Sequence, residues 1–244
     1  MPRANRYLVA GPAYHVTHRC HNRAFLFRFA RDRDAYRTML RDQIRARGDV
    51  EVLTYCITSN HVHLLLTSRG TDEAISALMQ ALEGEFAQFY NRRKKRTGAF
   101  WGGRFHATMI DSGEYLWRCM RYIDLNMVRA GVVSHPAEWA WTGYREIAGL
   151  RCRYRVVSLP GILERTGQLD ADRVVDWYKD WINDSSGGDA WKREAKWTES
   201  IAVGSREFVE SIGRRVEDRM NVRVAEDGTG GWLVKEHQES YSHY

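Results

Sequence analysis

Two hydrophobic periods alternate along the first 130 residues, and their order restricts the possible folds more than any other feature. A helical period is clearest in residues 75–90, where apolar side chains return every three or four positions at Ile75, Leu78, Met79, Leu82, Phe86, Phe89 and Tyr90. We expect Thr71 or Asp72 to cap this helix. Residues 14–20 instead alternate in the manner of a strand, with Tyr14, Val16 and His18 facing one way.

Segments of these two kinds follow one another in the order β-α-β-β-α-β-α. The expected strands are residues 14–20, 50–58, 61–67 and 105–110, and helices are expected at residues 32–47, 75–90 and 112–128. This order fits an α+β fold in which helices pack against one face of a four-stranded antiparallel sheet, the ferredoxin-like arrangement.

The periodicity weakens beyond about residue 141. Helices are expected at residues 159–166, 171–182 and 205–219, with a polar linker at 183–188. The last stretch is rich in glycine and poor in apolar residues, so we expect it to be mobile unless it docks on the main domain. We therefore divide the chain into a main domain (1–145), a helical C-terminal appendage (146–222) and a tail (223–244).

Positive charge is concentrated in the first part of the chain. The net charge is +6, but residues 1–110 hold 18 Lys and Arg against 9 Asp and Glu. Such an excess favours an anionic polymer as partner, because each neutralised phosphate releases counterions. Solubility alone explains the excess equally well, so motifs have to decide.

The sequence also bears on the cellular compartment. It has no run of about 18 apolar residues and no apolar leader, which predicts a cytoplasmic protein without a membrane partner. The four cysteines form no C-x-x-C pair. This pattern argues against a zinc ribbon and suits a reducing compartment.

Two histidines at alternate positions of an expected strand are the first candidate site. His61 and His63 project from the same face of the strand, which is the spacing needed to offer two nitrogens to one metal ion. A pair of half-buried histidines on a polar sheet face is the commoner meaning of an isolated H-x-H. Tyr122 and Asn126 stand four residues apart on the third helix and could approach this pair.

Together these residues describe a mechanism. His61, His63 and the side-chain oxygen of Asn126 would hold a divalent cation, and the oxygen of Tyr122 would attack a phosphorus atom that the cation polarises.

The two motifs also resemble the paired signatures of a known family. NHVHLLL, followed about 60 residues later by YIDLNMVRAGVV, resembles the single-tyrosine branch of the HUH endonucleases. YHVTHRCHNRAFLF, FWGGRF and EWAWTGY resemble the REP-associated tyrosine transposases within the IS200-like superfamily, and the similarity runs through residues 12–145. Met127 stands where family members often have proline.

The resemblance implies a ferredoxin-like nuclease that recognises hairpins in single-stranded DNA, such as REP-like palindromes. It implies cleavage with Mg²⁺ or Mn²⁺ that leaves a 5′-phosphotyrosine and a free 3′-hydroxyl, with Tyr122 as nucleophile and His61, His63 and Asn126 as metal ligands. It also favours a monomer that acts in cis. A non-catalytic hairpin-binding protein, and a hydrolase that uses a water nucleophile, are the alternatives.

Contacts to DNA are expected from three places. The basic segment after the second helix is the first, Trp101 and Arg104 next to the sheet are the second, and the turn after the first strand is the third. The candidates are Arg92, Arg93, Lys94, Lys95, Arg96, Trp101, Arg104, Arg19, Asn22 and Arg23. For the basic segment, a solvated charged loop is equally consistent with the pattern. A zinc site of His15, His18 and His21 is not expected, because every third residue of a strand alternates faces.

Overall fold

One sheet of seven strands runs through the computed structural model, which describes residues 8–184, 192–218 and 220–236. The strands of these residues are β1 (Ala13–Arg19), β2 (Val50–Ile57), β3 (His61–Ser68), β4 (His106–Ile110), β5 (Ala202–Gly204), β6 (Val222–Glu226) and β7 (Trp232–Glu236). Their helices are α1 (Ala30–Arg47), α2 (Ala74–Lys94), α3 (Glu114–Asp124), α4 (Asn126–Arg129), α5 (Tyr144–Ile147), α6 (Leu159–Thr166), α7 (Ala171–Asn183), α8 (Lys196–Glu199) and α9 (Arg206–Glu217), with 3-10 turns at His21–Arg23 and Pro136–Glu138.

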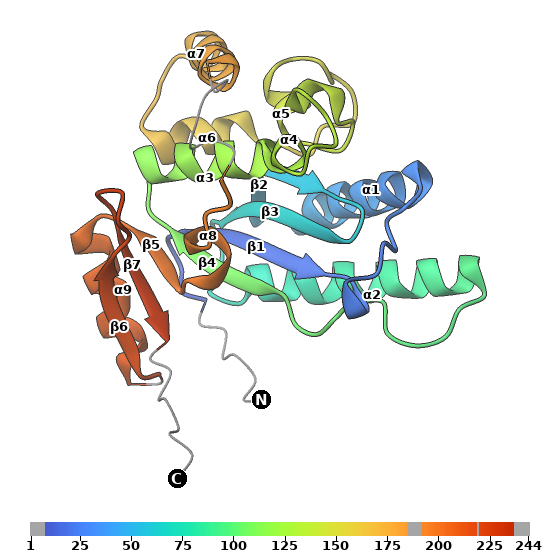
Figure 1. Cartoon of the computed structure of the whole chain (residues 1–244), viewed down its shortest axis with the longest axis horizontal. Coiled ribbons are helices and arrows are strands. Elements are labelled where there is room, and N and C mark those ends of the chain that lie inside the picture. Colours follow the sequence, from blue (N-terminus) through green and yellow to red (C-terminus); the bar gives the residue numbers. More distant parts are fainter. Residues whose placement is uncertain (1–7, 185–191, 219, 237–244) are drawn as a thin grey trace.

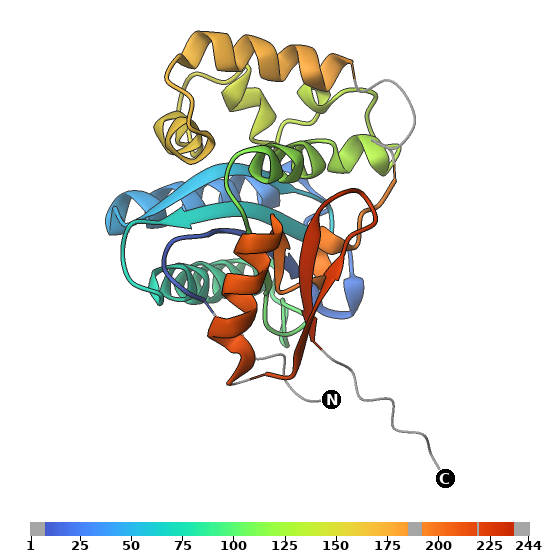
Figure 2. The same ribbon diagram turned by 90° about the vertical axis from the view of Figure 1, so that its left-hand side faces the viewer.

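The first four strands form the core of the sheet in the order β2-β3-β1-β4, and they pair antiparallel throughout. This arrangement confirms the α+β, ferredoxin-like prediction. The helices α1 and α2 cover one face of these strands, as predicted, whereas α3 lies on the other face (Figures 1 and 2). The sheet is therefore covered on both sides.

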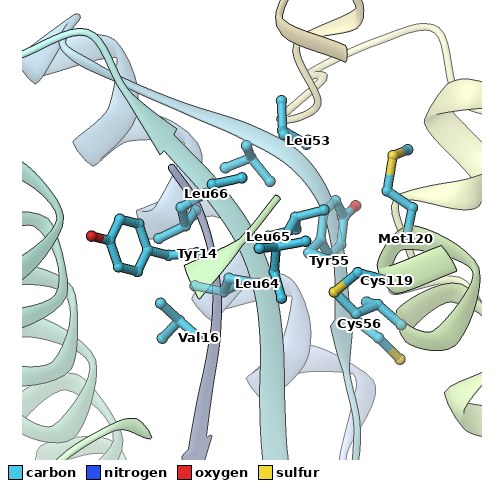
Figure 3. Packing of buried hydrophobic residues seen from close by; sticks show 14 of the residues in the cluster. Tyr14, Val16, Leu53, Tyr55, Cys56, Leu64, Leu65, Leu66, Cys119 and Met120 are labelled. Carbon is cyan, nitrogen blue, oxygen red and sulfur yellow. The ribbon is translucent and has the colours of Figure 1, made fainter. Parts of the chain in front are cut away.

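The alternation of strand side chains explains why both faces are buried. Tyr14 and Val16 of β1 point to one side of the sheet, and Cys56 of β2 points to the other, where Cys119 and Met120 of α3 meet it (Figure 3). All five side chains are buried. Because both faces of β2 and β3 are covered, these strands read as almost continuous apolar runs in the sequence.

A second layer of helices lies over α3 and is tied to the sheet through Asp124. α6 and α7 lie beyond α3 as seen from the sheet (Figures 1 and 2). The buried carboxylate of Asp124 accepts hydrogen bonds from Thr54 of β2 (2.7 Å), Thr142 (3.0 Å) and Tyr178 of α7 (2.7 Å). Burial raises the pKa of Asp124 to about 6. The helices predicted at residues 159–166, 171–182 and 205–219 are confirmed as α6, α7 and α9.

The C-terminal segment extends the sheet rather than leaving it. β5 pairs parallel with β4, and β7 and β6 follow in antiparallel order. Residues 223–236 of the tail, which we expected to be mobile unless they docked, do dock, and Leu233 and Val234 are buried there. The appendage is also not purely helical, because β5 lies within it. Most of the predicted linker, residues 185–188, and residues 237–244 of the tail lie outside the described residues.

Two helix ends differ from the prediction. No side-chain cap bond is made at the start of α2, which begins at Ala74 after Glu73, so the expectation of a Thr71 or Asp72 cap is wrong. The Asp72 carboxylate instead accepts a hydrogen bond from the backbone of Ala10. The third helix was expected to run unbroken through residues 112–128, but it ends at Asp124, and α4 begins after the non-helical Leu125.

Candidate active site

The first candidate ligand, His61, lies at the start of β3, where a local network sets its protonation. Its Nδ1 is 2.7 Å from Oδ1 of Asn60 and 3.0 Å from the hydroxyl of Thr58, and that hydroxyl donates to the His61 carbonyl. An amide oxygen only accepts, so Nδ1 carries the ring proton. The Nε2 atom of neutral His61 therefore holds a lone pair. Nδ2 of Asn60 donates to the carbonyl of Arg23, which fixes the orientation of this amide.

His63 faces the same side as His61, as the strand alternation predicts. Their ring centroids are 4.8 Å apart. The Nε2 atom of His63 lies 3.1 Å from Nδ2 of Asn126. The ring of Tyr122 lies edge-on to His63 with centroids 6.2 Å apart. The fold thus brings together the four residues that the sequence nominated, from β3, α3 and α4.

The break between α3 and α4 shapes this group. Because α3 ends at Asp124, Asn126 begins a new helix and does not continue the face of α3 that carries Tyr122. Arg129 of α4 folds back across the break. It donates to the carbonyl oxygen of Tyr122 (2.6 Å), and its guanidinium lies 4.1 Å from the centre of the Tyr122 ring. Sequence reasoning missed Arg129, although its spacing of three from Asn126 is a helical one.

Burial controls the protonation of the group. It lowers the pKa of His61 to about 3 and that of His63 well below the ordinary value, so both imidazoles are neutral at physiological pH. Burial also raises the pKa of Tyr122, and the positive charge of Arg129 opposes that increase. Tyr122 therefore keeps its phenolic proton at neutral pH.

These residues fit a divalent cation in part. Two neutral imidazoles with Nε2 lone pairs are suitable ligands, and an amide oxygen suits Mg²⁺ or Mn²⁺. The Asn126 amide presents its nitrogen to His63, so it has to turn by about half a rotation to offer its oxygen. Among the described residues, no three His, Cys, Asp or Glu side chains group as metal ligands.

Two adjoining clefts with many basic side chains flank the site. One, of about 590 Å³, is lined by Arg19, Arg23, Arg104 and Arg193, among others. The other, of about 680 Å³, contains Tyr122 and Arg129 and again Arg193. Arg19, Arg23 and Arg104 were nominated from the sequence, and the fold places them together. Arg193 had no recognisable signal, because it lies outside every motif.

Other nominated DNA-binding residues lie elsewhere. Asn22 is exposed in the 3-10 turn after β1, with a left-handed φ of 51°. Arg92 and Lys95 are exposed at the end of α2, and Lys94 lies 4.4 Å from the ring centre of Phe29. Arg92 and Lys94 lie in the last turn of α2 and Lys95 follows it, and α2 covers the face of the sheet opposite to α3, the helix that carries Tyr122 (Figure 1).

Three of the nominated residues are held by the protein itself. Arg93 forms an ion pair with the buried Asp32. Arg96 donates to the side chain of Asn91 and to the carbonyl of Ala99. Trp101 stacks on His18 with centroids 4.1 Å apart and donates to a backbone carbonyl of α2, so it packs in the aromatic core.

One protein family matches the part of the chain that carries the candidate site. Residues 9–126 match the family described as "Transposase IS200 like". These residues, slightly less than half of the chain, are similar to that family. The match contains His61, His63 and Tyr122 and ends at Asn126.

Two proteins that are similar to this chain are informative. A Haemophilus influenzae protein named as a REP-associated tyrosine transposase is 27% identical over 103 residues, a match that covers 38% of this chain and 58% of that protein. The chain thus spans little more than half of that relative's length. A solved structure of a REP-associated tyrosine transposase bound to a REP hairpin has a TM-score of 0.53 at 19% identity, and the match covers 61% of this chain and 86% of that one. This second likeness is one of fold.

The described residues contain no helix that is long and apolar enough to cross a membrane.

His15 and His18 lie on opposite faces of the sheet, as the alternation of strand side chains predicts. His18 bonds to Glu83 of α2 on one face of the sheet, whereas His15 meets His63 on the other, so these histidines do not converge.

Proposed function

We propose that the chain is a metal-dependent endonuclease and strand transferase that cuts single-stranded DNA at hairpins such as REP-like palindromes. The observation that carries this proposal is the convergence of Tyr122, His63 and Asn126 from three separate elements. A module that only binds DNA has no chemical use for a buried phenol beside His63, an imidazole that the neighbouring His61 accompanies.

The protein residues have separate roles in the reaction. His61, His63 and Asn126 would hold Mg²⁺ or Mn²⁺, which supplies Lewis-acid polarisation of the scissile phosphate. Tyr122 is the nucleophile. Its ring is held by edge contacts with His15 and His63, and Arg129 lies over one face. These contacts restrict the direction in which the phenolic oxygen points.

The reaction is a transesterification. A bond forms between the Tyr122 oxygen and phosphorus while the bond from phosphorus to the 3′ oxygen breaks. The phenolic proton leaves to solvent, and the departing 3′ oxygen takes a proton, so the products are a 5′-phosphotyrosine and a free 3′-hydroxyl. One phosphoester bond replaces another, so the step needs no high-energy cofactor. A 3′-hydroxyl of a new strand can later attack the phosphotyrosine and reverse the step.

Arg129 is well placed to assist this step. It lies in the cleft that contains Tyr122 and has a carbonyl and an aromatic ring as partners. A positive charge there stabilises both the phenolate and the charge that accumulates on the phosphoryl oxygens.

The substrate assignment has a separate basis. The adjoining clefts carry Arg19, Arg23, Arg104 and Arg193, which suit the phosphates of a DNA strand. The fold is that of a transposase solved with a REP hairpin, and this supports a hairpin as the partner. Tyr122 and His63 of one chain lie in contact distance, which supports a monomer that acts in cis.

One experiment separates the proposal from its two alternatives. The chain is incubated with end-labelled hairpin DNA and Mn²⁺ and then denatured. A denaturant-stable adduct of protein and DNA is expected. Cutting without an adduct would instead indicate a hydrolase with a water nucleophile, and binding without cutting would indicate a non-catalytic hairpin-binding protein.

A further inference from the structure

A third histidine, His15, contacts the candidate cation site from β1. It is fully buried and sits opposite Leu65 of β3, on the same face of the sheet as His63. Its Nε2 atom lies 2.9 Å from Nδ1 of His63, and its own Nδ1 lies 2.7 Å from the carbonyl oxygen of Trp197. The three groups form a chain of hydrogen bonds that ends at Nε2 of His63.

The direction of these hydrogen bonds follows from the carbonyl of Trp197. A carbonyl oxygen can only accept, so Nδ1 of His15 carries a proton and donates it to Trp197. The hydrogen-bond partners of His15 are a carbonyl and a second imidazole, and neither is a carboxylate that would stabilise a buried imidazolium. His15 is therefore neutral, and its Nε2 accepts. Nδ1 of His63 must then donate, which leaves the lone pair of His63 on Nε2.

The contact with Asn126 agrees with this direction. The Nδ2 group of Asn126, which is a donor, lies 3.1 Å from Nε2 of His63. With the Asn126 amide in this orientation, the contacts at both ends of the His63 ring agree with the same tautomer. The protein places the lone pair on the side where Tyr122, His61 and Asn126 converge.

We propose that His15 is a positioning residue which, together with the carbonyl of Trp197, locks His63 in the Nδ1-protonated form and so prepares Nε2 for the cation. This inference rests on the proposed role of His63 as a ligand. A ligating imidazole whose other nitrogen donates to a fixed acceptor has a set orientation and a more basic ligand atom.

The proposal also gives the C-terminal segment a function. Trp197 belongs to α8, outside the residues that match the transposase family, and it is fully buried. Two backbone carbonyls a few residues further on are anchored as well, because Ser200 accepts from Thr108 of β4 (2.8 Å) and Ile201 accepts from the amide of Met109 (2.8 Å). The segment that carries β5 therefore holds the acceptor in place against the sheet.

Nitrogen NMR on the full chain tests the protonation directly. In a long-range ¹H–¹⁵N spectrum of the ¹⁵N-histidine-labelled protein without metal, His15 and His63 are both expected as Nδ1-protonated neutral rings. Assignment of His63 as the Nε2-protonated form would overturn the proposal. This readout needs no DNA cleavage, so it can fail while the proposed function stands, and the reverse also holds.

Metal affinity gives the second test. In His15→Phe, Mn²⁺ binding measured by calorimetry is expected to weaken about 10- to 100-fold. His15→Gln, whose amide oxygen can accept from His63, should recover part of that loss. The matched control is His106→Phe on β4, because His106 also bonds to a carbonyl of the C-terminal segment, that of Ser200, without a bond to His63. Its Mn²⁺ affinity should stay within about twofold of wild type. If folded His15→Phe binds Mn²⁺ as tightly as wild type, His15 does not position the ligand.

Discussion

Replacement of Tyr122 by Phe is the sharpest test of the site, because a second tyrosine on the same helix offers a competing nucleophile. Tyr115 and Tyr122 both lie on α3, seven residues apart. At 1.5 Å per residue this spacing separates them by about 10 Å along the helix axis. A nucleophilic oxygen has to lie about 3 to 3.5 Å from the phosphorus atom it attacks. A phosphate next to His63 is therefore within reach of Tyr122 and too far from Tyr115.

The surroundings of the two rings agree with this difference. The Tyr122 ring contacts the rings of His15 and His63. Tyr115 lies against Gly231 in the turn between β6 and β7, away from the histidines. We expect Tyr122→Phe to lower cutting and adduct formation at least about 1000-fold, since the nucleophile is lost while the ring is kept. Hairpin affinity should change less than about twofold, because phosphate contacts supply most of it.

The assay is single-turnover cleavage of labelled hairpin DNA with Mn²⁺, followed by peptide mapping of the trapped adduct. Tyr115→Phe is the matched control and should still form the adduct. DNA attached to Tyr115, or an undiminished adduct in Tyr122→Phe, would show that the nucleophile has been assigned to the wrong residue.

Four further outcomes follow from the same geometry. His63→Ala should abolish cutting in Mg²⁺ and keep hairpin binding in a gel-shift assay, and equal cleavage by the variant would remove the ligand assignment. Neutralising Lys94 and Lys95 should weaken binding and flatten its salt dependence by about one unit of slope per lost contact, whereas an unchanged slope would mean that this segment is only solvated. Arg129→Gln should slow single-turnover cutting about 100-fold with hairpin affinity changed far less, and an unaffected rate in a variant of normal thermal stability would remove Arg129 from the reaction. Because burial raises the pKa of Tyr122 and lowers that of His63, cutting should rise about tenfold per pH unit between pH 6 and 8.5, as the phenolate fraction grows, and a flat profile would contradict rate-limiting attack by the phenolate.

Local periodicity was enough to predict the core of the fold and which candidate side chains share a face. A strand alternates its side chains whatever its neighbours are, so the spacing of His61 and His63 already placed both on one face. The apolar stripes of α1, α2 and α3 and the order of the elements then left few arrangements open. The family-like motifs linked Tyr122 and Asn126 to the same site.

The tertiary structure decided which groups complete that site, because contacts between distant segments leave no local period. The bond from His15 to Trp197 joins residues 182 positions apart, and nothing in either segment indicates it. The docking of residues 222–236 depends on backbone pairing at the edge formed by β5, which a glycine-rich, weakly apolar sequence does not reveal. Likewise, the capture of Arg93 by Asp32 was decided by the packing of α2 against α1. The sequence by itself determined which residues share a face of their own element, and only the fold determined which faces meet.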